Sequence, residues 1–80
     1  MNAATYAEVM RRLETAGAAA PRGRIHHASY GPPEELLVVD IWDTPDNFRA
    51  FGAILVPILM ALGVTLPEPV IMPVNNVVRG

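Results

Sequence analysis

The sequence of 80 residues contains no cysteine and no lysine. Without cysteine the chain has neither a disulfide nor a thiolate nucleophile, so its stability must come from packing or from assembly. Its net charge is −2 and it has no basic run, which argues against a nucleic-acid partner. Two histidines leave little from which to build a metal site, and no glycine-rich loop for a nucleotide or flavin follows a strand. We therefore expect no metal and no cofactor.

Charged residues are also scarce, at 18% of the chain, whereas 51% of the residues are hydrophobic. A monomer of this size buries only about 60% of the surface that its unfolded chain exposes. The chain therefore carries more apolar material than one small core can hide. We expect a single domain over residues 1–80 that buries the surplus in a homodimer.

One uncharged stretch, Ala50–Pro67, has nearly the length of a membrane span. Gly52, Pro57 and Gly63 interrupt it, and no basic cluster or aromatic belt flanks it. The N-terminus shows no apolar core followed by a signal-peptide cleavage site. The sequence therefore favours a cytoplasmic location without a membrane partner.

Apolar residues at three- and four-residue steps predict a helix over residues 3–16, with Thr5 as a candidate N-cap. A second helix is predicted from Thr44 at the N-cap and Pro45 at the first helical position to about Gly63. Its expected buried stripe consists of Phe48, Phe51, Leu55, Ile58, Leu59 and Leu62.

Three strands are predicted between and after these helices. Arg24–Tyr30 and Glu35–Asp43 form a hairpin around the turn Gly31–Glu34, and Val70–Val78 forms a last strand. Pro73 makes that last strand an edge strand or places a bulge in it. The order α-β-β-α-β predicts an α+β fold with two helices on one face of an antiparallel sheet.

The second strand is apolar at nearly every position, reading LLVVDIW over residues 36–42. A strand buried on both faces in so short a chain indicates that the sheet of another subunit lies against it. One carboxylate, Asp40, stands in this run, and burying it is costly unless a partner compensates its charge. We therefore expect a site at Asp40.

The adjacent residues His26 and His27 point to opposite faces of their strand. If Gly31–Glu34 is the whole loop, His27 shares the face of Asp40, and a loop one residue longer places His26 there instead. A histidine paired with Asp40 would be a general base whose tautomer the carboxylate sets.

In a competing interpretation, Asp40 accepts hydrogen bonds from the backbone, Arg24 or Arg49 and has no catalytic role.

Four further residues are candidates for binding a ligand. Trp42 offers a flat surface and an indole N–H to an aromatic molecule, although a tryptophan in such a strand more often serves core or interface packing. Tyr30 lies either at a pocket mouth or in a solvated turn. Asn75 and Asn76, near the chain end, form either a substrate clamp or a bend.

The run GRIHHASYGPPEELLVVDIWDTPDNFRAF, followed by a helix with Pro57 and Gly63 and by PEPVIMPVNNVV, resembles a known family. It is similar to small actinobacterial proteins of the dimeric α/β-barrel superfamily, the ferredoxin-like proteins grouped with antibiotic-biosynthesis monooxygenases. The resemblance covers about residues 5–78. The matching features are Gly23, His27, Asp40, Trp42, Phe48, Phe51, Pro57, Gly63 and Asn76.

This resemblance implies a homodimer whose two sheets enclose an apolar cavity, and it favours His27 over His26 as the partner of Asp40. It implies a cofactor-independent monooxygenase or cyclase for an aromatic or polyketide-like molecule. The His27–Asp40 pair would deprotonate a phenol or enol while Trp42 stacks on it. Haem is not expected, because the second helix offers no His, Cys or Tyr ligand.

Two departures from the family pattern qualify this expectation. Members usually begin with a strand, whereas only MNAA precedes the first helix here. Asn75 stands where such relatives tend to have His, which removes a titratable group. The competing hypothesis is a non-catalytic module that binds a small molecule or effector and dimerises.

Overall fold

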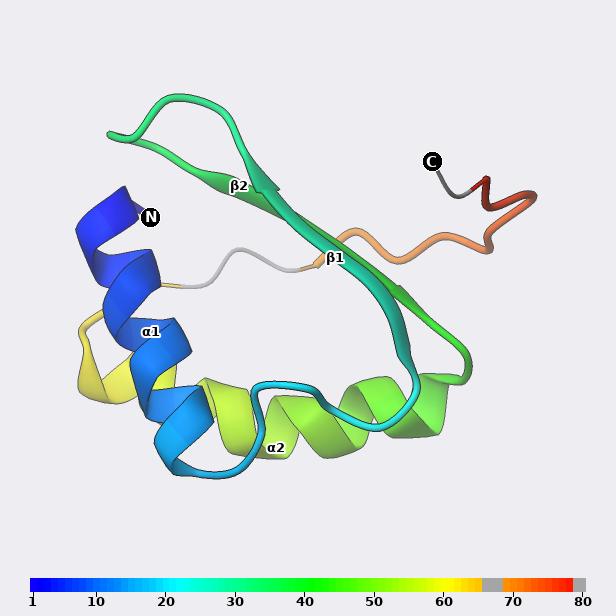
Figure 1. Ribbon diagram of the computed structural model, residues 1–80, viewed down its shortest axis with the longest axis horizontal. Helices are drawn as coiled ribbons and strands as arrows, with labels where there is room; N and C mark the ends of the chain where they lie inside the picture. Colours follow the sequence, from blue (N-terminus) through cyan, green and yellow to red (C-terminus); the bar gives the residue numbers. More distant parts are fainter. Residues whose placement is uncertain (66–68, 79–80) are drawn as a thin grey trace.

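The structure is a computed structural model that describes residues 1–65 and 69–78. Its elements are α1 (Ala3–Thr15), β1 (Arg24–Tyr30), β2 (Leu37–Trp42) and α2 (Pro45–Ala61). The two strands form an antiparallel hairpin that arches over both helices (Figure 1). The predicted α+β class and the order helix, strand, strand, helix are therefore confirmed.

Helix α1 begins one turn earlier than a cap at Thr5 would allow. Asn2 is the N-cap, because its side-chain oxygen accepts a hydrogen bond from the Thr5 N–H at 2.8 Å. The prediction of Thr5 as the N-cap was wrong, because Asn2 caps the helix three residues upstream and Thr5 lies inside its first turn. The helix buries Val9 and Leu13 toward α2.

The hairpin loop is longer than predicted. Tyr30 lies opposite Leu37 and His27 lies opposite Asp40, so residues 31–36 form the loop. The N-terminal residues explain the difference, since the Leu36 N–H donates to the carbonyl of Met1 at 2.6 Å and so holds Leu36 outside the β1–β2 pair. The loop exceeds the predicted GPPE loop by two residues, an even number, so His27 remains on the face of Asp40.

A register shift between Arg24 and His26 makes Ile25 the extra residue of a β-bulge. The bulge places Arg24 opposite Trp42. At this end of the hairpin, Trp42 of β2 packs against Phe48 and Phe51 of α2.

Helix α2 matches its predicted bounds closely. The Thr44 hydroxyl accepts a hydrogen bond from the Asn47 N–H at 3.2 Å, and Pro45 occupies the first turn. The helix ends where Gly63 adopts a positive φ of 71°, a conformation that glycine takes without strain. Phe51 and Leu59 of the predicted stripe are buried.

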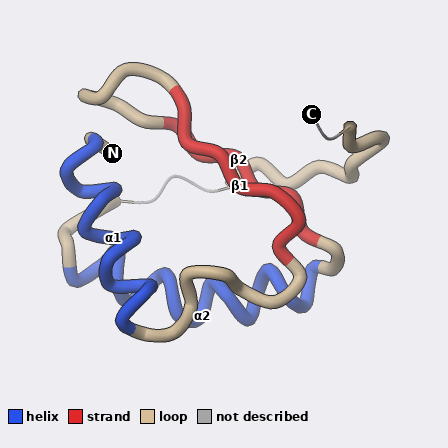
Figure 2. Tube along the Cα trace, viewed as in Figure 1, coloured by secondary structure: helices blue, strands red, loops and turns tan. Residues whose placement is uncertain are grey.

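The core lies between the two helices and is small (Figure 2). Its buried members are Val9, Leu13, Ala18, Phe51 and Leu59. In the part of the chain that the structure describes, no helix covers the outer face of the hairpin, and both Leu37 and Val39 remain about half exposed.

The predicted strand Val70–Val78 was wrong, because residues 69–78 form neither a strand nor a helix. Val70 is 84% exposed and Ile71 is 71% exposed. Pro73 lacks an N–H group for a ladder, and among the described residues no strand precedes α1 that could pair with this segment. The sheet of the described residues therefore has two strands.

Candidate functional site

The site is built on the pair His27 and Asp40, which face each other across the hairpin. The Nδ1 atom of His27 lies 2.5 Å from Oδ1 of Asp40, and about a fifth of each side chain is exposed. A short contact between an imidazole and a carboxylate is typical of a charge-assisted hydrogen bond. The hydrogen bond to His27 offsets the desolvation free energy of placing the Asp40 carboxylate in an apolar strand.

Tyr6 of α1 completes a chain of three side chains. Its hydroxyl lies 2.7 Å from the Nε2 atom of His27. The two rings are nearly parallel, with an interplanar angle of 3° and centroids 6.1 Å apart. His27 is thereby held at both nitrogens, by a strand residue on one side and a helix residue on the other.

These contacts assign the hydrogen positions by chemistry. An ionised Asp40 only accepts hydrogen bonds, so Nδ1 of His27 carries the proton and donates it. In the neutral imidazole, the Nε2 atom then keeps its lone pair and accepts from the Tyr6 hydroxyl. A neutral imidazole with a carboxylate behind it and a lone pair in front can act as a general base.

The competing partners proposed for Asp40 are engaged elsewhere. Arg24 donates to the carbonyl of Ala19 at 3.0 Å, and its guanidinium carbon lies 5.7 Å from the centroid of the Phe51 ring. Arg49 pairs with Asp46 on the exposed side of α2. The arginine interpretation of Asp40 was therefore wrong.

Trp42 lies on the same face of β2 as Asp40, two residues further along. Its ring packs against α2, with centroids 5.3 Å from Phe51 and 5.9 Å from Phe48. Its Nε1 atom is buried and has no hydrogen-bond partner among the described residues. A buried N–H without an acceptor is unusual in a folded protein.

The three residues His27, Asp40 and Trp42 face the helices, since Tyr6 belongs to α1 and Phe51 to α2. The strand pattern and the family resemblance predicted a cavity between two facing sheets for them instead. Tyr6 of α1 and Phe51 of α2 pack against this face, and the strand pattern alone does not show which face the helices cover.

The remaining candidates do not join this group. His26 lies opposite Ile41 on the other face of the hairpin, and Tyr30 is 52% exposed near its turn. Asn75 and Asn76 are exposed in the C-terminal segment. Tyr6 is the site residue that sequence reasoning missed, because it matched the apolar stripe of the first helix. Its hydroxyl was the available signal, since a half-buried tyrosine usually needs a hydrogen-bond partner.

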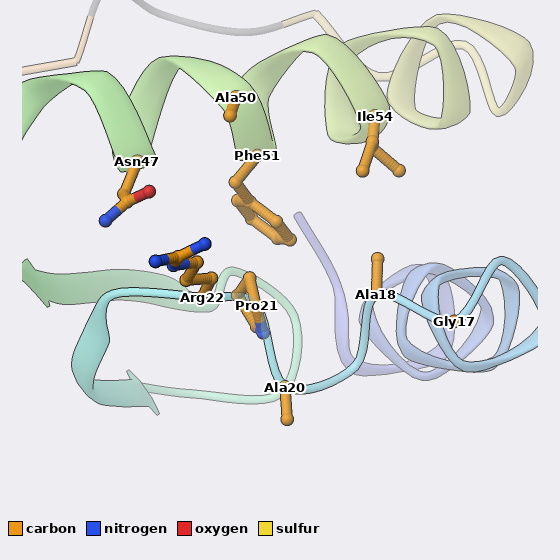
Figure 3. A pocket seen from close by; sticks show the side chains of 9 residues that line it. All are labelled: Gly17, Ala18, Ala20, Pro21, Arg22, Asn47, Ala50, Phe51 and Ile54. Carbon is orange, nitrogen blue, oxygen red and sulfur yellow. The ribbon is translucent and has the colours of Figure 1, made fainter.

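A separate hollow of about 290 Å³ lies between α2 and the segment that follows α1 (Figure 3). Phe51 and Ile54 line one wall, while Ala18 and Pro21 line the other. Neither His27 nor Asp40 lines it. The hollow is therefore distinct from the Tyr6–His27–Asp40 group.

Beside this hollow, Gly23 makes close backbone contact with two polar side chains. It has a φ of 85°, and a Cβ there would collide with Asp43 and Asn47. The Asn47 amide donates to Asp43 at 2.9 Å, and this hydrogen bond lowers the pKa of the Asp43 carboxyl. Because residue 23 has no side chain, the backbone just before β1 can pass close to Asp43 and Asn47 at the start of α2.

Within residues 1–65 and 69–78, no group of three or more His, Cys, Asp and Glu residues is placed to hold a metal ion. No helix in the same part of the chain is long and apolar enough to span a membrane. Comparisons with protein-family models, with curated proteins and with solved structures find no match for this chain.

Proposed function

We propose that the chain forms a homodimer that binds a small aromatic or polyketide-like molecule and uses His27 as a general base. The observation that carries this proposal is the placement of His27 between Asp40 at 2.5 Å and Tyr6 at 2.7 Å. The resemblance to dimeric α/β-barrel proteins supports the homodimer and the class of substrate.

In this proposal the acidic O–H of a phenol or enol replaces the Tyr6 hydroxyl at the Nε2 atom of His27. His27 takes the proton, and Asp40 stabilises the imidazolium that results. Trp42 lies on the same face, and its buried N–H lacks an acceptor among the described residues. A substrate that enters beside the indole would stack on it and supply an oxygen for this N–H. Proton transfer of this kind typically contributes a factor of about 100 to 10,000 in rate.

If the protein is a monooxygenase, the deprotonated substrate would react as a carbanion with molecular oxygen, without a cofactor. The atoms balance when a ring CH₂ becomes a carbonyl: one oxygen atom stays on that carbon, and the other leaves with the two hydrogens as water. Cyclisation of a polyketide-like chain needs the same base and no oxygen. The two reactions are therefore distinguished by oxygen uptake.

A second candidate function is a binding module without catalysis. It is favoured by the Tyr6 hydroxyl, which already occupies the lone pair that a general base must offer. In that case the three side chains tie α1 to the hairpin, and any ligand binds without losing a proton.

The test uses Trp42, which is the single tryptophan of the chain. A panel of hydroxylated naphthalenes is titrated against Trp42 fluorescence, and the panel members that bind are then assayed for oxygen uptake and for cyclised products. The proposal expects His27→Gln to retain binding and lose about 100-fold or more in turnover. Binding by the wild type without turnover of any panel member would support the module instead.

A further inference from the structure

The outer edge of β2 is identified by two backbone hydrogen bonds at its ends. The Asp43 N–H donates to the carbonyl of Gly23 at 2.9 Å, on the side of β1. The Leu36 N–H donates to the carbonyl of Met1 at 2.6 Å, on the opposite side. Backbone groups alternate between the two edges of an antiparallel strand. Even-numbered residues of β2 therefore direct their N–H and C=O groups away from β1.

These even-numbered residues are Val38, Asp40 and Trp42. Within residues 1–65 and 69–78, no backbone hydrogen bond reaches their outward groups. A strand edge with free donors and acceptors is a template for another strand. The edge also carries the site, because the side chains of Asp40 and Trp42 belong to it.

The chain exposes more surface area than is typical of a folded monomer of its mass. A folded monomer of 8.7 kDa is expected to expose about 4,700 Å². The chain exposes 6035 Å², so the excess is about 1,300 Å² by the same scaling. A standard protein interface buries about 800 Å² on each partner. The excess is thus sufficient for a stable protein–protein contact.

The C-terminal segment has the properties of a strand without a partner. Residues 74–78 read VNNVV, directly after Pro73, and valine favours strands. Val74 is 54% exposed and Val78 is 80% exposed. A proline immediately before a strand costs it no hydrogen bond.

We propose that residues 74–78 of a second copy add as a third strand to the outer edge of β2, and that the exchange is reciprocal. This inference rests on the homodimer of the proposed function. Neighbouring residues of a strand point to opposite faces, so either Asn75 or Asn76 of the added strand must lie on the face of Asp40 and Trp42. The second copy thereby supplies an amide to the site, which one chain alone leaves open at this edge.

Hydrogen exchange of single backbone amides tests this edge directly, on the full-length protein. In the dimer, the amides of Val38, Asp40 and Trp42 are expected to exchange about 100-fold or more slowly than in an unstructured chain. Slow exchange at Leu37, Val39 and Ile41 reports only the β1–β2 pair. A dimer in which the three even-numbered amides exchange freely would overturn the inference while leaving the homodimer in place.

The occupant is tested with Asn76→Pro and Val77→Pro, because one of these two positions must donate to β2 in any register. Whichever of the two prolines removes a donating N–H is expected to abolish the slow hydrogen exchange of the Val38 and Asp40 amides. Ile71→Pro lies outside the added strand and is expected to leave that slow exchange unchanged. Protection that survives both prolines would exclude the C-terminal segment. Protection in a protein that light scattering shows to be monomeric would exclude a second copy.

A cross-link separates exchange between chains from closure within one chain. The chain has no cysteine, so one copy carrying Val38→Cys is mixed with another carrying a single cysteine at Val74, Asn75, Asn76 or Val77. A disulfide-linked heterodimer is expected with at least one of the four. With Glu14→Cys, at the exposed end of α1, none is expected. Failure of all four would overturn the inference.

Discussion

The rings of Tyr6 and His27 lie nearly parallel, and the tyrosine hydroxyl is 2.7 Å from the Nε2 atom of the imidazole. This contact joins α1 to the inner face of the hairpin. It is also the point at which a substrate hydroxyl would have to enter. Tyr6 therefore stabilises the fold and occupies the place that a substrate hydroxyl would take in the proposed chemistry.

Removing the Tyr6 hydroxyl tests its structural share. Tyr6→Phe leaves the ring stacked on His27 but leaves the half-buried Nε2 without its donor, so we expect a loss of about 1 kcal/mol in the free energy of unfolding. Urea denaturation measures it. The matched control is Tyr30→Phe, at a tyrosine that is 52% exposed, and it should change stability by less than about 0.5 kcal/mol.

In the enzyme reading, the same Tyr6→Phe variant gives a second readout. Freeing the lone pair of Nε2 should raise the affinity for a phenolic ligand, because the ligand no longer displaces a hydroxyl. Titration of Trp42 fluorescence measures this affinity. Weaker binding by Tyr6→Phe would show that Tyr6 contacts the ligand rather than competing with it.

Asp40→Asn should destabilise the protein by about 2 kcal/mol, because the amide cannot replace the charge-assisted hydrogen bond to His27. The free energy of unfolding of Asp40→Asn, His27→Gln and the double variant forms a thermodynamic cycle. We expect a coupling of about 1 kcal/mol or more between the two residues. Additive losses would mean that the pair contributes nothing as a pair.

Gly23→Ala is expected to cost more than about 1 kcal/mol of stability, since φ is positive and the new Cβ meets Asp43 and Asn47. Gly17→Ala is the matched control, because Gly17 has a similar φ of 74° but open space around it. Thermal unfolding of the two variants separates the collision from the backbone strain. Equal losses would show that Asp43 and Asn47 move aside at no cost.

Glu8 gives a pH dependence with a defined sign. Hydrogen bonds from Arg11 and Arg12 lower the pKa of its carboxyl from 4.5 to about 2. The ionised form is therefore favoured in the folded state, and its stabilising contribution is full above pH 4.5 and disappears as the pH falls through 2. Carbon NMR of the Glu8 carboxyl against pH measures the value. A midpoint near 4.5 would show that the two arginines do not hold it in solution.

Much of the fold was accessible from local sequence chemistry. Thr44 and Pro45 predicted the start of α2, and the run of β-branched residues around Val38 and Val39 predicted β2. Both predictions succeeded because helix caps and strand propensity act within a few residues. The loop length and the last strand were not accessible in this way. The loop depends on Met1 holding Leu36, and the fate of Val70–Val78 depends on which strand edges exist, so both are set by distant parts of the chain.

The candidate site likewise has residues that could be predicted from the sequence and features that could not. His27, Asp40 and Trp42 could be named because a carboxylate and an indole in an apolar strand need partners. Their side of the sheet was predicted wrongly, since it follows from how Tyr6 of α1 and Phe51 of α2 pack against the hairpin. Tyr6 was missed because a helical stripe position looks the same whether the tyrosine hydroxyl faces solvent or an imidazole.

Nitrogen NMR of the His27 side chain tests the central assignment most directly. If Asp40 accepts from Nδ1–H and Tyr6 donates to Nε2, neutral His27 shows a protonated Nδ1 and an unprotonated Nε2, in a single tautomer that Asp40→Asn disturbs and Tyr30→Phe does not. A neutral His27 with the proton on Nε2, or one that exchanges freely between tautomers as in an unstructured peptide, would contradict the account.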